Sequence, residues 1–340
     1  MTATIIARLF LSLPLFYLGM VTGRLQRRAK DSFLILMYHR VLTKQQVNWR
    51  IQPGMYVYDS TLKMQLMFLK RYFCVVDLSV LARIKESGNM PSGRPICAIT
   101  FDDGWRDFYE YAYPLLRSFE IPATVFLPTD FIGSDKLFWT DMVPDVLEKI
   151  NKLKDGGHDA DPDIEKAILE IRNLSGSRES ILEKAIEILK KYRLEQIEKM
   201  FEKIVEKQVD LQSAERVFLN WEQVRQMKNS GLVSFGSHTH SHRILTTLQS
   251  DEIYDELVDS RQKLMEEKAC DSEFIPFCYP NGNYDNKIIQ LVKEAGYSMA
   301  VTTKNGWNSW NDDFYSLKRI GIHNDMSFCP SMFGLRLLSG

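Results

Sequence analysis

The chain has 340 residues, of which 45% are hydrophobic and 26% charged, and its formal net charge is −1 at pH 7. This composition provides enough apolar side chains for a large core and excludes a wholly disordered chain, a collagen-like repeat and a small disulfide-stapled protein. A near-neutral charge gives no broad cationic face for a nucleic-acid backbone, so we expect no nucleic acid among the partners.

Residues 1–30 are expected to form an apolar, membrane-associating helix with a basic flank. Residues 2–23 carry one charge, Arg8, and a basic cluster follows them: Arg24, Arg27, Arg28 and Lys30. A cleaved secretory signal would place its basic residues first and end in small residues, so we do not expect one here. The segment is borderline for the roughly 20 apolar residues that span a bilayer.

Three interpretations of this segment stay open: a single membrane span, a helix lying in the membrane interface, or a helix packed on the protein itself. We predict membrane association with the catalytic domain on the cytoplasmic side. An extracytoplasmic catalytic domain is the alternative.

Continuous apolar runs of strand length recur along the rest of the chain, as is typical of strands buried on both faces. They are Phe33–His39, Phe73–Asp77, Ile96–Asp102, Ala123–Pro128, Leu232–Gly236, Phe274–Pro280, Tyr297–Thr303 and Leu317–Ile322. Helical patterns lie between several of them: Thr61–Arg71, Phe108–Phe119, Trp221–Asn229, Asp251–Lys268 and Asn286–Ala295. This alternation predicts an α/β fold over residues 31–340, a distorted (β/α) barrel of about seven or eight strands.

Residues 141–215 interrupt this alternation. They contain no strand-like run, and their apolar residues recur at spacings of three and four between many Glu and Lys residues. The pattern predicts amphipathic helices, and hence a helical insertion between the fourth and fifth barrel strands. We expect the charged residues of this insertion to form a face exposed to solvent.

Two adjacent carboxylates follow a buried strand in Thr100–Gly104, which reads TFDDG. Catalytic groups of α/β barrels lie at the carboxyl ends of the strands. Successive side chains on a strand point to opposite sides, so one Asp can bind a metal while its neighbour faces a substrate. Taken alone, Asp-Asp-Gly is also compatible with an ordinary turn.

A histidine cluster follows a later strand in Ser237–His242, which reads SHTHSH. His238 and His242 are four residues apart, a spacing that can place two imidazoles on one face. Two imidazoles and one carboxylate leave coordination positions open for water and substrate, as in hydrolytic zinc sites. A polar loop rich in His is the alternative.

With these two motifs, the sequence resembles the polysaccharide deacetylases, carbohydrate esterases with a NodB-like catalytic domain. TFDDG resembles their first motif and SHTHSH their second, while FCYPNG at Phe277–Gly282 is similar to the third in its F-x-Y-P-x-G form. The resemblance covers Ser32–Asp141 and Val217–His323.

The resemblance implies a role for each matching residue. Asp103, His238 and His242 would hold a divalent metal ion, zinc by resemblance, with cobalt or nickel as alternatives. Asp102 would be the general base that deprotonates the metal-bound water, which attacks the acetamide carbonyl. The backbone N–H of Asn281 would donate to the oxyanion.

Three further residues are assigned to the site. Tyr279, in the third motif, and His39, at the end of the first strand, are expected on the substrate side. His323, which follows the last strand, fits the family's fifth motif loosely and is the candidate general acid.

The chain also departs from the family's pattern. The third motif often opens with an arginine that orients the base, and Cys278 stands there instead. We propose Arg319, on the last strand, as the substitute; a peripheral salt bridge is the alternative for this residue. The fourth motif, an Asp before a Trp, is not recognisable, and Trp307 and Trp310 either line the acyl pocket or pack in the core.

The sequence therefore predicts a metal-dependent hydrolase that removes an N-acetyl group from an amino sugar in a polysaccharide or glycan precursor. Such an enzyme acts on a carbon–nitrogen bond other than a peptide bond, and its partner is an acetylated amino-sugar glycan. The alternatives are an amidase or O-deacetylase on a non-glycan substrate, and a non-catalytic glycan-binding module.

Overall fold

A computed structural model of the protein describes residues 12–14, 16, 19–28, 31–89, 93–150, 162–204 and 216–339. The chain divides into two compact units. The first comprises Met1–Thr43, Gly54–Ser134 and Val217–Gly340, and the second comprises Lys44–Pro53 and Asp135–Arg216.

The first unit is built on parallel strands that pair one after another. They are β1 (Ser32–Tyr38), β5 (Ile96–Phe101), β6 (Ala123–Leu127), β7 (Val233–Ser237), β8 (Pro276–Cys278) and β9 (Met299–Val301). β11 (Ile320–Gly321) pairs in parallel with β1, and Leu317, just before β11, forms a parallel bridge with Val301 of β9. The strands therefore curl round into a distorted barrel, which confirms the predicted fold class.

Burial explains why these strands were recognisable as continuous apolar runs. Every residue of β5 and β6 is buried. Side chains from neighbouring strands share one core cluster, including Phe33 and Ile35 of β1, Ile96 and Ala98 of β5, and Phe126 of β6. Parallel strands with both faces covered have no solvated face on which polar residues would alternate.

The other strands are short, and two of them pair with β1 or β5. β4 (Cys74–Val75) pairs with β5, and β10 (Asn308–Ser309) runs antiparallel to the start of β1. β2 (Arg40–Leu42) and β3 (Tyr56–Tyr58) form a separate parallel pair. β2, β3 and β10 were not predicted, because two or three residues are too few to show a period.

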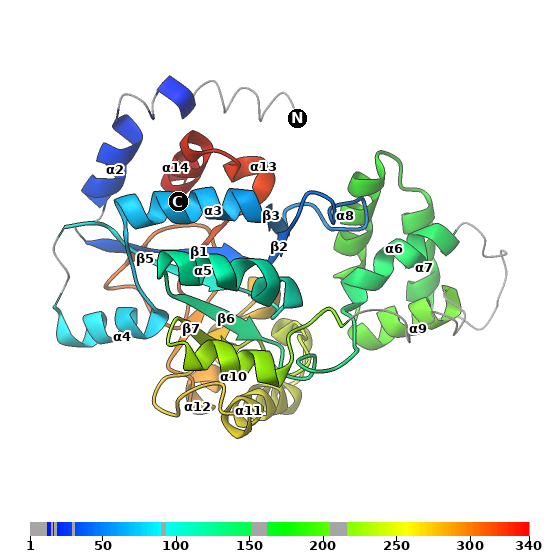
Figure 1. The fold of residues 1–340 in the computed structure, drawn as a ribbon. Coiled ribbons are helices and arrows are strands. Elements are labelled where there is room, and N and C mark those ends of the chain that lie inside the picture. The colour runs from blue at the N-terminus through cyan, green and yellow to red at the C-terminus, as the bar shows by residue number, and fades with distance from the viewer. Residues whose placement is uncertain are drawn as a thin grey trace. The chain divides into compact units, whose positions relative to one another are not determined.

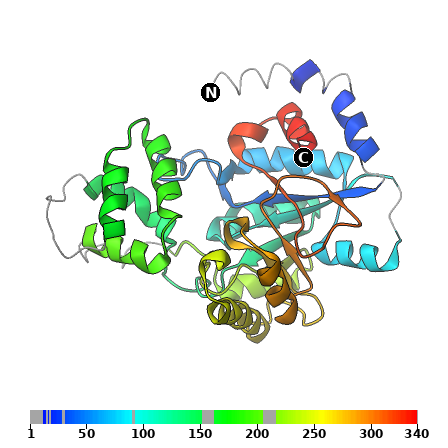
Figure 2. The same ribbon diagram turned by 180° about the vertical axis from the view of Figure 1, so that it is seen from behind.

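Helices surround the strands of the first unit (Figures 1 and 2). They are α3 (Asp59–Tyr72), α4 (Leu78–Ser87), α5 (Tyr113–Phe119), α10 (Trp221–Asn229), α11 (Ser250–Glu266), α12 (Asn286–Glu294), α13 (Asn324–Ser327) and α14 (Pro330–Leu338). Short turns of other helix types cover Phe108–Ala112 (π), Leu245–Thr247 and Pro280–Gly282 (both 3₁₀). Four of the five predicted helices agree with α3, α10, α11 and α12, and the fifth divides into the π-turn and α5.

The described part of the N-terminal segment packs on the first unit. Helix α2 (Met20–Arg28) buries Val21 and Leu25, and Val21 approaches Gly334 of α14 so closely that a Cβ there would lie 2.8 Å from it. Within the described residues, no helix has both the length and the apolar character needed to cross a bilayer. Most of the predicted apolar run, residues 1–11 included, lies outside the described residues.

The second unit is helical and has a core of its own. Its helices are α6 (Trp139–Lys149), α7 (Pro162–Arg172), α8 (Arg178–Leu189) and α9 (Leu194–Ile204). Side chains from all four form one apolar cluster that includes Val146, Ile168, Ile186 and Phe201. The segment Lys44–Pro53, which the sequence analysis did not associate with this region, belongs to the unit. There Arg50 forms ion pairs with Asp145 and Glu148 of α6.

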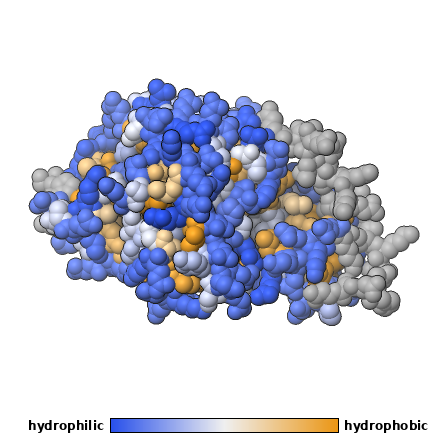
Figure 3. All heavy atoms as spheres, turned by 90° about the horizontal axis from the view of Figure 1, so that it is seen from below, coloured by the Kyte–Doolittle hydropathy of each residue, from blue (hydrophilic) through white to orange (hydrophobic). Residues whose placement is uncertain are grey.

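On the face drawn in Figure 3, hydrophilic residues dominate and apolar residues form small separate patches. Large hydrophobic side chains that are exposed are few in the described part of the chain: Leu13, Met20, Met67, Leu169 and Tyr254. Most apolar side chains are therefore buried in the cores.

Candidate metal centre

The acidic motif, Thr100–Gly104, and the histidine motif, Ser237–His242, lie at the carboxyl ends of two strands of the same sheet. Asp102 and Asp103 follow β5 directly, and His238 follows β7, with β6 between the two strands. Backbone hydrogen bonds continue the strand pairing into both motifs: Asp102 N donates to Tyr38 O at 2.9 Å, and His238 N donates to Leu127 O at 2.9 Å. The barrel topology therefore brings together residues that are more than 130 positions apart in the chain.

Asp103, His238 and His242 form a compact group of ligand atoms. The Nε2 atoms of His238 and His242 lie 3.4 Å and 3.3 Å from the same oxygen, Oδ1 of Asp103. Asp103 and His238 are buried, and His242 is partly exposed. One carboxylate oxygen and two imidazole nitrogens fit a divalent transition-metal ion and leave further coordination positions for water and substrate.

The backbone of both motifs adopts left-handed conformations. The φ angles are 75° at Asp103, 65° at Gly104, 65° at Thr239 and 60° at His242. Such angles cost energy for residues other than glycine and persist where the surrounding structure enforces them. At Gly104 an added Cβ would also lie 2.8 Å from terminal methyl carbons of both Leu127 and Ile132, so these side chains would have to shift.

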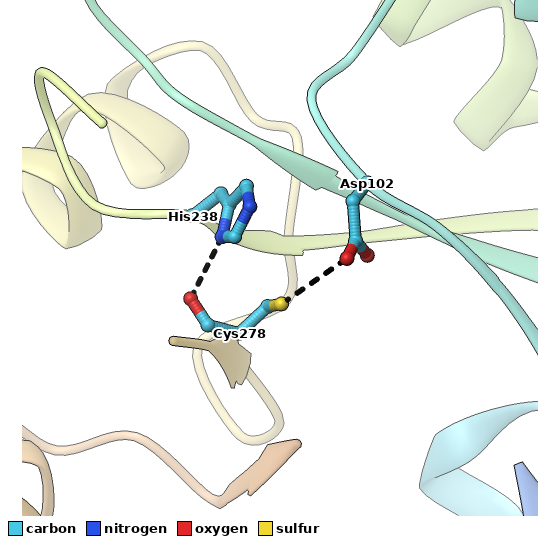
Figure 4. A group of neighbouring side chains, drawn as sticks. All are labelled: Asp102, His238 and Cys278. Carbon is cyan, nitrogen blue, oxygen red and sulfur yellow. Dashed lines mark hydrogen bonds between the residues drawn. The ribbon is translucent and has the colours of Figure 1, made fainter. Parts of the chain in front are cut away.

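The tautomer of His238 follows from its contacts. Its Nδ1 lies 2.8 Å from the carbonyl oxygen of Cys278 (Figure 4), and a carbonyl can only accept, so Nδ1 carries the proton. Nε2 faces Oδ1 of Asp103 and is therefore the ring atom that would release its proton to bind a metal ion. Metal-binding histidines usually donate their other N–H in this way, which fixes the ring and raises its basicity.

For Asp103 and His238, neighbouring groups shift the pKa in the direction opposite to the shift caused by burial. Burial raises the pKa of Asp103, but the hydrogen bonds from His238 and His242 outweigh it, so the pKa lies well below its usual range. Burial lowers the pKa of His238, but its contacts with Cys278 and Asp103 hold that pKa well above its usual range. Asp103 is therefore an ionised acceptor, ready for a cation.

Asp102 is held by Arg319 in a two-pronged ion pair. Arg319 Nη1 and Nη2 lie 2.7 Å and 2.7 Å from Oδ1 and Oδ2 of Asp102. The other N–H groups of Arg319 donate to Thr302 O at 2.8 Å, Thr100 Oγ1 at 3.0 Å and Cys278 Sγ at 3.1 Å, so all five are used. Arg319 has 0% of its surface exposed, so its salt bridge is not peripheral. Burial raises the pKa of Asp102, but Arg319 outweighs burial and the pKa is lowered.

Asp102, His238 and Cys278 form a second group of potential ligands (Figure 4). This group does not fit a metal ion, because both oxygens of Asp102 and the sulfur of Cys278 accept hydrogen bonds from the Arg319 guanidinium. A cation already compensates these acceptors, and a metal ion there would be repelled by it. The donor set with Asp103 is therefore the better candidate.

Two further predicted histidines lie at the same edge of the barrel. Nε2 of His39, which follows β1, is 3.9 Å from Oδ2 of Asp102. His323 follows β11, whose pairing with β1 extends to a hydrogen bond from Ile322 N to Met37 O. The ring of His323 contacts the carboxylate of Asp325 through Nδ1.

The third motif divides into an exposed and a buried part. Asn281 is exposed, and none of the hydrogen bonds among the described residues uses its backbone N–H. Tyr279 is fully buried: its hydroxyl donates to Tyr315 O at 2.9 Å and its N–H donates to Val301 O at 3.2 Å. Neither group of Tyr279 is available to a substrate, so its expected place on the substrate side is corrected to a packing role.

Trp307 and Trp310 lie away from the candidate centre. Trp310 packs against Phe33, with ring centroids 4.5 Å apart, and Trp307 donates to Leu337 O at 2.8 Å. Both flank β10, which pairs with the amino end of β1. Because the acidic and histidine motifs lie at the carboxyl ends, these rings do not line an acyl pocket there.

Two residues that the sequence analysis missed contact the motifs directly. Trp105 Nε1 donates to Oδ2 of Asp103 at 3.0 Å. Glu256 of α11, which is buried, accepts hydrogen bonds from the N–H groups of His240 at 2.9 Å and Ser241 at 2.8 Å, and from the Ser241 hydroxyl. A signal for Glu256 was present, since it shares the apolar face of its helix with Ile253 and Leu257.

A family profile described as "Polysaccharide deacetylase" matches residues 89–161 and 175–300, more than half of the chain. The poly-β-1,6-N-acetyl-D-glucosamine N-deacetylase of Staphylococcus epidermidis is 36% identical over 114 residues, which are 31% of this chain and 39% of that protein. The protein of the same name from Staphylococcus aureus strain N315 is 29% identical over 167 residues, 46% of this chain and 55% of that protein. The chain thus matches less than two thirds of the length of either relative.

Solved structures share the fold. The Streptococcus pyogenes deacetylase PplD in complex with acetate aligns with a TM-score of 0.57 and 20% identity, covering 90% of this chain and 98% of that one. IcaB from Ammonifex degensii aligns with a TM-score of 0.57 and 16% identity, covering 91% of this chain and 98% of that one.

Proposed function

Because the chain belongs to the polysaccharide deacetylase family, we propose that it is a metal-dependent hydrolase that removes the N-acetyl group from an amino sugar in a polysaccharide or glycan precursor. One observation carries the proposal: the Nε2 atoms of His238 and His242 converge on one oxygen of Asp103, beside a second carboxylate that Arg319 keeps ionised. Two relatives named as N-deacetylases of a poly-N-acetylglucosamine support the substrate class.

Asp103, His238 and His242 would hold the metal ion, for which we propose zinc, with cobalt or nickel as alternatives. When bound, a divalent ion supplies a Lewis acid that polarises the amide carbonyl and lowers the pKa of water. The burial of Asp103 and His238 limits competing solvent around their ligand atoms. The partial exposure of His242 leaves the group open on one side.

Asp102 would accept the proton of the attacking water, because the Arg319 ion pair lowers the pKa of Asp102 and keeps its carboxylate charged. The water oxygen bonds to the amide carbon, and the N–H of Asn281 would donate to the oxyanion. The carbon–nitrogen bond then breaks, His323 would give a proton to the amine nitrogen, and acetate leaves. His39 would line the rim beside Asp102.

The cellular location stays a prediction: membrane association, with the catalytic unit on the cytoplasmic side. Arg24, Arg27 and Arg28 of α2 are exposed, which supports attraction to anionic lipid. Protease digestion of intact cells and of inverted vesicles tests the side. Degradation of the protein in inverted vesicles alone supports the cytoplasmic side, and degradation in intact cells contradicts it.

Acetate release from defined substrates tests the activity. The zinc-loaded protein is incubated with β-1,6-linked N-acetylglucosamine oligomers, with O-acetyl esters and with simple amides. We expect acetate from the oligomers, and a loss of at least about 100-fold in Asp102→Asn, because positioned general bases contribute roughly 10²–10⁴-fold. The matched control is Asp271→Asn, which alters an exposed carboxylate paired with Lys228 and should keep full activity.

The other outcomes separate the alternatives. Acetate from esters alone would indicate an O-deacetylase, and acetate from simple amides alone would indicate an amidase. Bound metal without acetate from any substrate would favour a glycan-binding module.

A further inference from the structure

The indole ring of Trp105 is held rigidly beside the candidate metal centre. Its backbone forms an antiparallel bridge with Phe218, whose ring stacks on the indole at a centroid distance of 4.8 Å. The flanking residues are tied to the same segment, since Arg106 N donates to Val217 O at 2.8 Å and Leu219 N donates to Gly104 O at 2.9 Å. Only 4% of the surface of Trp105 is exposed.

The two carboxylate oxygens of Asp103 have different partners, and one of them accepts the indole N–H of Trp105. Oδ2 accepts the hydrogen bond from Trp105 Nε1 at 3.0 Å. Oδ1 faces both imidazoles, at 3.4 Å from His238 Nε2 and 3.3 Å from His242 Nε2. A carboxylate held in this way presents one oxygen to a cation, and rotation that would offer both oxygens breaks the hydrogen bond.

A partly buried ion pair contacts the ring from another side. The guanidinium carbon of Arg40 lies 4.4 Å from the centroid of the Trp105 ring. Arg40 Nε donates to Oδ2 of Asp107 at 2.8 Å, and Oδ1 of Asp107 accepts the N–H of Val41 at 2.9 Å. A cation over the ring face attracts the indole and keeps its plane in place.

We propose that Trp105 is a positioning residue of the metal centre: its indole N–H restricts Asp103 to binding the ion through Oδ1 alone, and the Arg40–Asp107 pair fixes the indole. The assignment rests on the proposed function, because it presupposes the ion at Asp103, His238 and His242. Hydrogen-bond partners of metal ligands typically change metal affinity by about 10- to 100-fold when they are removed.

The test compares Trp105→Phe with wild type in the full chain. Zn²⁺ affinity is measured by competition with a chelating indicator, and the visible spectrum of the Co²⁺-loaded protein reports coordination number. In Trp105→Phe we expect the dissociation constant to rise about 10- to 100-fold and the Co²⁺ bands to weaken, because a freed carboxylate binds through both oxygens. In Arg40→Gln, which keeps the indole, we expect a rise of about two- to five-fold, because the variant loses the cation–π contact that keeps the ring in place.

Trp307→Phe is the matched control. It removes an indole hydrogen bond of 2.8 Å to Leu337 O in the same unit, far along the fold from the acidic and histidine motifs. Its Zn²⁺ affinity and Co²⁺ spectrum should equal those of wild type, whatever its thermal stability. If Trp105→Phe does not fold, Arg40→Gln decides: a raised dissociation constant supports the assignment and an unchanged one overturns it.

The failures of the two proposals are distinguishable. A wild-type protein that binds metal, together with a Trp105→Phe variant of equal affinity and equal spectrum, would overturn the role of Trp105 and leave the proposed function intact. A wild-type protein that binds neither Zn²⁺ nor Co²⁺ would overturn the proposed function itself.

Discussion

Asp102 combines deep burial with a lowered pKa, and Arg319 is the reason. Burial alone raises the pKa of a carboxyl group, but here a guanidinium 2.7 Å from each oxygen outweighs it. The planar fork of Arg matches a carboxylate as no other side chain does. In this chain the guanidinium comes from Arg319, immediately before β11, whereas the family's usual arginine position holds Cys278, which accepts a hydrogen bond from Arg319.

Replacing Arg319 by Lys should therefore shift the pH profile of activity. A lysine lacks the two parallel N–H groups that match both oxygens, so it stabilises the carboxylate less. The effect of burial then dominates, and the pKa of Asp102 rises. Asp102 accepts a proton only when ionised, so the acid limb of kcat/KM should move to higher pH. We expect kcat/KM itself to fall by at least about tenfold, since general bases contribute roughly 10²–10⁴-fold.

The control is Arg336→Lys, which alters an arginine that donates to Gly321 O in the same unit. Its pH–rate profile should match that of wild type. An unchanged acid limb and unchanged kcat/KM in Arg319→Lys would contradict the role of Arg319.

The loop after β5 depends on Gly104. Its φ of +65° favours glycine, and a Cβ would also lie 2.8 Å from two side-chain carbons. Gly231 has a similar φ of +72° with nothing within 4 Å of an added Cβ. A substitution at Gly231 therefore measures the free-energy cost of the left-handed backbone conformation alone. In urea unfolding we expect Gly231→Ala to cost about 1–2 kcal/mol. Gly104→Ala should cost about 1–3 kcal/mol more, from overpacking. Equal losses would show that the space around Gly104 is not restrictive.

Helix α11 holds the histidine loop through Glu256. The carboxylate accepts two N–H groups and one hydroxyl from His240 and Ser241, between the two candidate metal ligands. Glu256→Gln replaces one acceptor oxygen by a donor, so we expect about 1.5–3 kcal/mol lower unfolding free energy and about tenfold weaker Zn²⁺ binding. Glu266→Gln, on the exposed face of the same helix, should change unfolding by less than about 0.5 kcal/mol. Loss of stability with unchanged Zn²⁺ affinity would contradict the link to the centre.

The elements differ in how far the sequence predicts them. β1, β5 and β6 were predictable to within two residues, because strands buried on both faces are continuous apolar runs. The residues of the acidic and histidine motifs were recognisable because their types and spacing carry metal chemistry.

The contacts that support the motifs were not predictable. Trp105, Arg40 and Asp107 meet only through the fold, and nothing in one sequence distinguishes a partly buried Arg–Asp pair from a solvated one. The assignment of Lys44–Pro53 to the second unit is likewise a tertiary fact. Of the two interpretations of Trp307 and Trp310, the contacts of both rings agree with packing in the core and not with an acyl pocket.

Among the described residues, each unit has an apolar cluster of its own. Ile186 belongs to the core of the second unit and Leu81 to that of the first, and both are fully or almost fully buried. Truncation of such a residue to Ala typically costs about 2–5 kcal/mol. We expect Ile186→Ala to speed amide hydrogen exchange in α6–α9 while β1 and β5 keep their protection, and Leu81→Ala to do the reverse. Faster exchange in both units from either variant would contradict independent cores.

The measurement that tests the account most directly is an anomalous-scattering map of Zn²⁺-loaded crystals, recorded at the zinc absorption edge. The account predicts one strong peak bonded to Oδ1 of Asp103 and to Nε2 of both His238 and His242, with Asp102 still paired to Arg319. A peak bonded to Asp102 and Cys278 instead, or no peak among these residues in protein that binds zinc in solution, would contradict it.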